Sequence, residues 1–247
     1  MHQRPVLLVI AHGSRDPRHA ATVHALVRRV RSRRPGLRVE TGFLDFNIPS
    51  VQGVLESLAA EGVQDVVALP LLLTRAFHAK SDIPAVLDAA PPRLRIRQAE
   101  VLGPSPLLVH ALERRLYEAG LTPADRSTTG IVLASAGSSD PEAIAVIEDL
   151  ARQWRRTGWC AVRPAFASAA LPRTEDAVRE LRARGVRQVA VAPYVIAPGR
   201  LPDRIAAGAA QAGADVLADV LGPAPELAAL LLDRYAAAGR DRHPAMI

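Results

Sequence analysis

Short apolar runs alternate with longer stretches of helical periodicity throughout the chain. The first half contains four apolar runs, and each is followed by a stretch in which apolar residues recur every three or four positions. Two of these runs are nearly continuous in Val, Leu and Ile, as expected for strands covered on both faces, whereas the last one alternates, which suits a strand near an edge. The predicted strands cover residues 6–10, 38–44, 65–73 and 94–102, and the predicted helices cover 17–32, 50–60, 82–89 and 105–118. This alternation predicts right-handed βαβ crossovers and a parallel sheet.

Several short sequence segments of the first half recur in the same order in the second half. The segment VLLVIAHGSRDP, which begins at Val6, matches GIVLASAGSSDP, which begins at Gly130. GVQDV at 62–66 matches GVRQV at 185–189, and the tetrapeptide VLGP at 101–104 occurs again at 220–223. Because several matches in one order are improbable by chance, the sequence predicts a tandem duplication.

The duplication and the strand–helix alternation together predict the fold class. We expect an α/β protein with two tandem flavodoxin-like domains, each with a four-stranded parallel sheet flanked by helices. The predicted domains cover residues 1–120 and 130–247. The segment 121–129, which contains Pro, Ser and Thr, is the predicted linker.

Composition places the chain among soluble globular proteins. Of its 247 residues, 49% are apolar and 23% charged, and no apolar run approaches the roughly 20 residues that a membrane span requires. A single cysteine, Cys160, excludes an intrachain disulfide and a cysteine-ligated iron–sulfur cluster. We therefore expect a cytoplasmic protein that does not contact a membrane.

The net charge of +6 favours an anionic partner. Lys80 is the only lysine among 31 basic residues, and the densest arginine cluster lies within 28–34. This cluster fits the C-terminal end of a helix, where cations complement the helix dipole. No aromatic residues accompany it for base stacking, so we do not expect a nucleic-acid partner.

Polar residues with metal-binding chemistry follow three of the predicted strands. His12 comes after the first strand, Asp45 after the second and His78 after the third. In open α/β sheets ligands bind beyond the carboxyl ends of the strands, so these side chains converge if the first strand lies between the other two. Two imidazoles and a carboxylate can hold a divalent transition metal, and the same groups can accept protons near neutral pH.

The second copy of the repeat serves as an internal control for these three residues. Ala136, Ser168 and Leu201 stand at the positions equivalent to His12, Asp45 and His78, while framework glycines and prolines persist. The joint loss suggests that the three residues serve one function, which only the N-terminal half retains.

Three motifs of the first half resemble the class II sirohydrochlorin chelatases, which include ferrochelatases of sirohaem synthesis and cobaltochelatases of anaerobic cobalamin synthesis. The motifs are AHGSRDPR from residue 11, FLD from residue 43 and PLLLTRAFHAKSDIP from residue 70. The resemblance implies two chelatase-like halves in one chain, with His12 and His78 as the metal-handling pair. Asp45 stands where this family usually has glutamate.

The resemblance also implies a substrate and the residues that bind it. Sirohydrochlorin is a polycarboxylate tetrapyrrole, so cations near the histidines would lower the cost of holding it. The strand-to-helix turn at Ser14 could further cradle an anion on its backbone N–H groups. The candidate substrate-binding residues are Ser14, Arg15, Arg75 and Lys80 from the first half and Arg200 and Arg204 from the second.

We therefore expect a sirohydrochlorin ferrochelatase. Fe²⁺ is the first choice of metal substrate, because some cobalt-handling members of the family that the chain resembles carry a His-rich tail and this sequence shows none. The alternatives are Co²⁺ and possibly Ni²⁺. No nucleotide or redox cofactor is required. A neutral histidine acts as base, so activity should fall below roughly pH 6.5. The fused second half predicts a monomer. A non-catalytic metal or tetrapyrrole carrier remains the alternative from another class.

Overall fold

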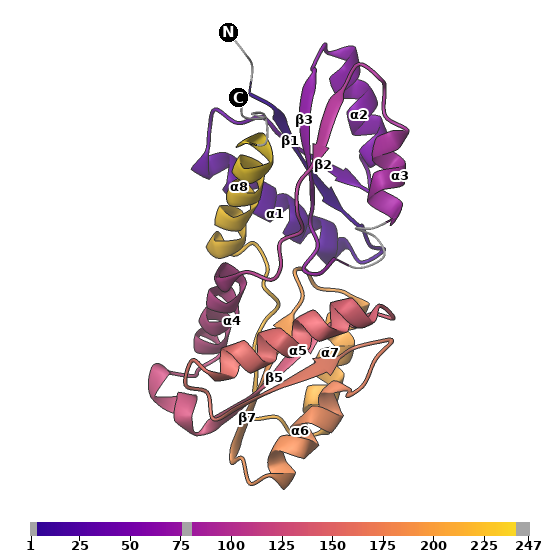
Figure 1. Cartoon of the computed structure of the whole chain (residues 1–247). Helices are drawn as coiled ribbons and strands as arrows, with labels where there is room; N and C mark the ends of the chain where they lie inside the picture. Colours follow the sequence, from indigo (N-terminus) through magenta and orange to yellow (C-terminus); the bar gives the residue numbers. More distant parts are fainter. Residues whose placement is uncertain (1–3, 76–80, 241–247) are drawn as a thin grey trace, which may run out of the picture. The chain divides into compact units, whose positions relative to one another are not determined.

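The computed structural model describes residues 4–75 and 81–240. The chain forms two compact units, one made of residues 1–103 together with 223–247 and the other made of residues 104–222. Each unit contains one four-stranded parallel sheet with helices on both faces (Figure 1). The predicted fold class and duplication are therefore confirmed. Within the described ranges, no helix is long and apolar enough to cross a bilayer.

The sheet of the N-terminal unit has the order β2-β1-β3-β4, with all neighbours parallel. Its strands are β1 (Val6–Ala11), β2 (Val39–Phe43), β3 (Asp65–Pro70) and β4 (Arg95–Gln98). Every residue of the central strand β1 is buried, whereas β4 at the edge is not, as its alternating sequence predicts. The position of β1 between β2 and β3 is the arrangement that the prediction of a shared edge required; it brings His12 and Asp45 to one sheet edge, whereas His78 lies outside the described residues.

Among the described residues, the helices that belong to this unit are α1 (Pro17–Arg33), α2 (Val51–Ala60), α3 (Ile83–Asp88) and α8 (Pro225–Arg240). The Asp16 carboxylate accepts a hydrogen bond from the backbone N–H of Arg18 at 2.9 Å and caps α1, and Pro17 suits the first turn. Ser50 caps α2 by accepting from the N–H of Gly53 at 3.1 Å. Both caps fix where the chain leaves the carboxyl edge of the sheet.

The second unit repeats this architecture with the strand order β6-β5-β7-β8. Its strands are β5 (Thr129–Ser135), β6 (Ala161–Phe166), β7 (Gln188–Tyr194) and β8 (Val216–Leu217). Its helices are α4 (Pro106–Glu118), the 3-10 helix η2 (Pro123–Ser127), α5 (Pro141–Arg155), α6 (Thr174–Ala183) and α7 (Arg200–Gln211).

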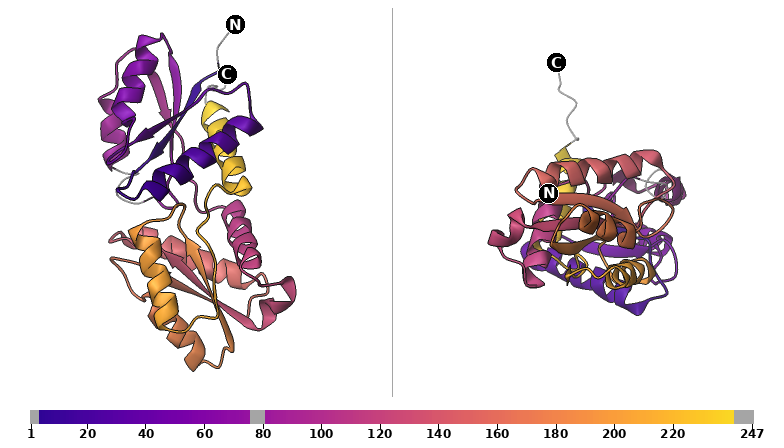
Figure 2. Two further views of the ribbon diagram at one scale, coloured as in Figure 1. Left: turned by 180° about the vertical axis from the view of Figure 1, so that it is seen from behind. Right: turned by 90° about the horizontal axis from the view of Figure 1, so that it is seen from below.

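The compact units differ from the predicted domains 1–120 and 130–247 because the last helix of each repeat belongs to the other unit. Helix α4 comes from the first repeat but packs on β7, and α8 comes from the second repeat but packs on α1 and β3. Figures 1 and 2 both show α8 beside α1. The Tyr235 hydroxyl on α8 donates to the carbonyl oxygen of Pro5 at 2.7 Å, which ties α8 to the start of β1. The predicted linker 121–129 includes η2 and the first residue of β5.

Candidate functional site

His12 and Asp45 lie together at the carboxyl edge of the N-terminal sheet. His12 directly follows β1, and the backbone N–H of Asp45 donates to the carbonyl oxygen of His12 at 2.9 Å. The His12 side chain is half-buried, whereas Asp45 is exposed, and its Oδ1 accepts from the N–H of Phe46 at 2.8 Å. His78 and Lys80, the other two predicted residues of this edge, lie outside the described residues.

A glycine makes the close approach of the two loops possible. Gly13 has a φ of +94°, and a Cβ at this position would overlap the carbonyl oxygen of Asp45. In the second unit, a Cβ at Gly137 would likewise overlap the carbonyl oxygen of Ser168. The N–H of Ser168 donates to the carbonyl oxygen of Ala136 at 3.0 Å. The second unit therefore retains the backbone of the site without its histidine and carboxylate.

The backbone N–H and the hydroxyl oxygen of Ser14 both have hydrogen-bond partners within the chain. The backbone N–H of Ser14 donates to the side-chain oxygen of Asn47 at 2.8 Å. The hydroxyl oxygen of Ser14 accepts from the N–H of Asp16 at 3.1 Å. Ser14 thus joins the β1–α1 turn to the loop after β2, and its own hydroxyl proton is the group that can still donate to a ligand.

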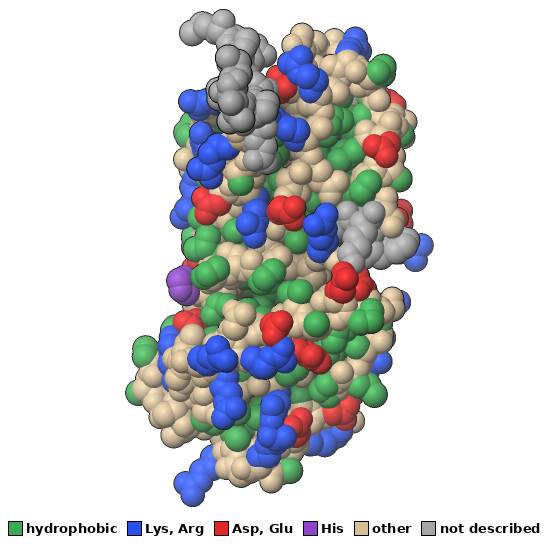
Figure 3. Space-filling view, in the orientation of Figure 1, with side chains coloured by type: hydrophobic (Ala, Val, Ile, Leu, Met, Phe, Trp, Pro, Cys, Tyr) green, Lys and Arg blue, Asp and Glu red, His purple; other side chains and the backbone are tan. Residues whose placement is uncertain are grey.

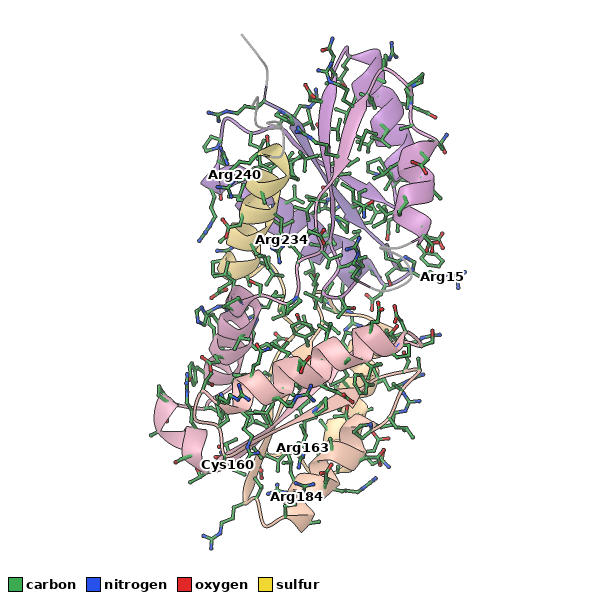
Figure 4. The ribbon with its side chains drawn as sticks, viewed as in Figure 1. Arg15, Cys160, Arg163, Arg184, Arg234 and Arg240 are labelled. Carbon is green, nitrogen blue, oxygen red and sulfur yellow. The ribbon has the colours of Figure 1, made fainter. Side chains whose placement is uncertain are left out.

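The candidate arginines are exposed side chains from different loops and helices. Arg15 lies just beyond β1, at the carboxyl edge of the N-terminal sheet (Figure 4). Arg75 follows β3 and makes a 3.8 Å ion pair with Glu100. In the second unit Arg200 begins α7, and Arg204 donates to the carbonyl oxygen of Ala167 at 2.9 Å. Acidic side chains are interspersed with basic ones on the surface seen in Figure 3, so the net charge does not collect there in one basic patch.

Sequence reasoning missed His19 as a neighbour of His12. His19 lies in the first turn of α1, which starts at the carboxyl edge of the sheet, and its Nδ1 atom is buried with no hydrogen-bond partner in the described part of the chain. Burial lowers the pKa of the His19 imidazole, and positive charge on His12 lowers this pKa further, whereas the Asp16 carboxylate opposes the shift. The sequence signal that could have identified His19 is its place in the first turn of the predicted helix, because that turn lies at the carboxyl edge of the sheet.

Phe46 is a second residue that the sequence interpretation did not select. Its ring centre lies 6.3 Å from that of His12 in an edge-to-face arrangement, and the Arg15 guanidinium carbon lies 4.9 Å from the ring centre. Half of the Phe46 side chain is exposed (49%). An imidazole, a carboxylate, a cation and an aromatic ring therefore share one small surface. Within 4–75 and 81–240, no three His, Cys, Asp or Glu side chains group as a complete metal site, and the predicted third ligand is His78.

These features define an α/β protein of two similar units, one of which carries a histidine and a carboxylate at the carboxyl edge of its sheet. The family model of CbiX matches residues 6–119 and, a second time, residues 130–238. The chain therefore belongs to the CbiX family, and both halves are copies of its repeat.

Named relatives include enzymes for two different metals. The chain is 29% identical over 211 residues to a sirohydrochlorin cobaltochelatase of Priestia megaterium, which covers 83% of this chain and 68% of the relative. It is 27% identical over 233 residues to a sirohydrochlorin ferrochelatase of the same organism, which covers 91% and 87%, respectively. The solved structure of SirB from Bacillus subtilis with Fe³⁺ has the same fold, with a TM-score of 0.83, 24% identity and 96% of each chain covered.

Proposed function

We propose that this protein is a sirohydrochlorin chelatase, which inserts a divalent metal ion into sirohydrochlorin, and that Fe²⁺ is the metal. The single observation that carries the proposal is the placement of His12 beside Asp45 at the carboxyl edge of a CbiX-family sheet. Relatives named for cobalt and for iron insertion support the reaction class. Co²⁺ is the second candidate metal because one of these relatives is named a cobaltochelatase.

The reaction needs a group that holds the metal ion and a group that accepts protons. The metal ion replaces two pyrrole N–H protons, so the macrocycle loses two protons for each metal ion it gains. A neutral imidazole can do either task, because it has one nitrogen lone pair for a metal or for a proton. We assign these tasks to His12 and, from the family resemblance, to His78, with the Asp45 carboxylate as a further metal ligand.

The carboxylates of sirohydrochlorin need cationic or hydrogen-bonding partners. Arg15 and Arg75 follow β1 and β3 of the N-terminal unit, and both side chains are exposed. We assign them, with the Ser14 hydroxyl and Lys80, to the carboxylate rim of the substrate. Arg200 and Arg204 are the corresponding candidates in the second unit. We further propose that the protein works as a cytoplasmic monomer, since the fused repeat supplies two units in one chain.

Anaerobic insertion assays with Fe²⁺, Co²⁺ and Ni²⁺ test the proposal. Formation of the metallated product is followed by absorbance against a blank without protein. His12→Ala and His78→Ala should abolish turnover, whereas His110→Ala, which removes an exposed histidine on α4, should leave it unchanged. A protein that binds sirohydrochlorin but only matches the blank would be a carrier, and the proposed enzyme function would then be wrong. The fastest metal identifies the preferred substrate.

A further inference from the structure

The loop after β2 exposes large apolar side chains, and one of them, Phe46, lies next to His12. Among the described residues, the exposed large hydrophobic side chains are Phe46 (49%), Ile48 (88%), Leu171 (73%) and Leu217 (42%). Phe46 and Ile48 belong to the loop of residues 45–49, and Leu171 stands at the position of Ile48 in the second unit. Exposed apolar side chains on a loop at the carboxyl edge of a sheet mark a surface for a ligand rather than part of the core.

The backbone of the 45–49 loop is held by hydrogen bonds. Asn47 N–H donates to the carbonyl oxygen of Asp45 at 2.7 Å, and the Asn47 side chain accepts from Ser14 N–H at 2.8 Å. Phe43 N–H closes the loop by donating to the carbonyl oxygen of Pro49 at 3.0 Å. Phe46 itself has a φ of +59°, a backbone conformation that residues other than glycine seldom adopt. These bonds therefore hold the backbone at Phe46, and the Phe46 ring is exposed.

The second unit shows that this backbone does not need an aromatic ring. Ala169 occupies the equivalent position with a φ of +60°. The two backbone hydrogen bonds are also repeated, because Ala170 N–H donates to the carbonyl oxygen of Ser168 at 2.7 Å and Phe166 N–H donates to that of Pro172 at 2.9 Å. The side-chain bond of Asn47 is not repeated, since Ala170 stands at its position. Since alanine supports the same loop, the Phe46 ring is not explained by folding. The ring is present in the unit that carries His12 and absent from the unit that lacks it.

We propose that Phe46 and Ile48 form an apolar platform that contacts the face of the tetrapyrrole macrocycle and positions it beside His12. This inference rests on the proposed function. A tetrapyrrole has a flat conjugated face and a rim of carboxylates, so it needs an apolar contact next to a cation. The Phe46 ring meets the first need, and Arg15, whose guanidinium carbon lies 4.9 Å from the ring centre, meets the second. Phe46 is thus a positioning residue for the substrate.

Phe46→Ala tests the platform, because Ala169 shows that the loop accepts alanine. The dissociation constant of metal-free sirohydrochlorin is measured by absorbance titration, and KM and kcat are measured with Co²⁺ and with Fe²⁺. We expect the dissociation constant and KM to rise about three- to tenfold while kcat changes less than twofold. Phe46→Tyr should restore both values. Binding of Co²⁺ without the macrocycle should not change, since the platform does not contact the metal.

Leu217→Ala is the matched control, because it removes an exposed apolar side chain from β8 without touching the 45–49 loop. If Phe46→Ala binds sirohydrochlorin as tightly as the wild type, the platform is wrong and the chelatase function stands. If the wild type binds the macrocycle without inserting metal, the chelatase function fails, and the weaker binding of Phe46→Ala still supports the platform. If the wild type does not bind the macrocycle, both proposals fail.

Discussion

Arg115 on α4 and Arg234 on α8 make equivalent contacts through Nη2 in opposite units. Arg115 donates through Nε and Nη2 to the carbonyl oxygen of Leu221, at 3.3 and 3.0 Å. Arg234, which Figure 4 shows on α8, donates through Nη2 to the carbonyl oxygen of Leu102 at 3.1 Å. Both the arginines and the leucines stand 119 positions apart, which is the offset of the repeat in this region. The final helices of the two repeats are therefore exchanged reciprocally.

The carboxylate of Glu113 on α4 anchors the exchanged helix in the second unit. It accepts from the indole N–H groups of Trp154 and Trp159 at 3.1 and 3.3 Å and from Nη2 of Arg126 at 2.9 Å. Glu113→Ala leaves the N–H groups of the two buried indoles without this acceptor, whereas Arg126 keeps its bonds to the Tyr117 hydroxyl and the Thr157 carbonyl oxygen, so we expect the free energy of unfolding to fall by about 2–4 kcal/mol.

Urea unfolding followed by tryptophan fluorescence measures this effect, because both indoles report on the site. Glu113→Gln keeps one acceptor oxygen and should cost less. Arg152→Ala, which breaks an exposed ion pair with Asp149, should change stability by less than about 0.5 kcal/mol and is the control. A Glu113→Ala protein as stable as the Arg152→Ala protein would contradict this account of the anchor.

Gly13→Ala should damage both stability and metal insertion. The new methyl group would overlap the carbonyl oxygen of Asp45, and the φ of +94° disfavours any residue but glycine. We expect a loss of at least about 2 kcal/mol, and a displaced Asp45 in whatever protein still folds. Gly36→Ala is the control, since its nearest neighbour is the Arg4 side chain at 4.0 Å. Thermal unfolding and the insertion assay should both give lower values for Gly13→Ala than for Gly36→Ala. Equal melting temperatures and equal insertion rates for the two variants would refute the steric argument.

The lowered pKa of His19 predicts a pH dependence of stability. In the unfolded chain this imidazole titrates near 6.5, whereas burial keeps it neutral to lower pH in the folded chain. Between the folded pKa and about 6.5 the unfolded state holds more protons, so the free energy of unfolding decreases as pH falls through this window. Below the folded pKa the contribution levels off.

Two measurements check the titration of His19. Proton NMR of the imidazole signals, assigned through His19→Asn, should give one histidine with a pKa below 6.5. The His19→Asn protein should also lose part of the decrease in stability between neutral and mildly acidic pH. A His19 signal that titrates at or above 6.5 would show that its ring is not buried in solution.

The sequence predicted that His12 and Asp45 lie together, because the ends of neighbouring parallel strands meet at one edge of the sheet. The strand order places β1 between β2 and β3, as the convergence of His12 and Asp45 requires. Phe46 could not be found in this way, because its exposure depends on a left-handed backbone conformation that a phenylalanine does not signal. The exchange of α4 and α8 was also hidden, since the apolar face of a helix does not specify which of two similar sheets it covers.

The exchange predicts how the chain behaves when it is cut between α4 and β5. A fragment that ends after α4 lacks α8, whose Leu227, Leu230 and Leu231 are buried in the N-terminal unit. Each fragment alone would expose the sheet face that the missing helix covers, so neither should unfold cooperatively. Coexpressed fragments should copurify and elute together from a size-exclusion column, because each contributes the final helix of the other unit. Arg234→Ala should weaken this association. If either fragment alone gives a cooperative thermal transition, its unit does not depend on the exchanged helix.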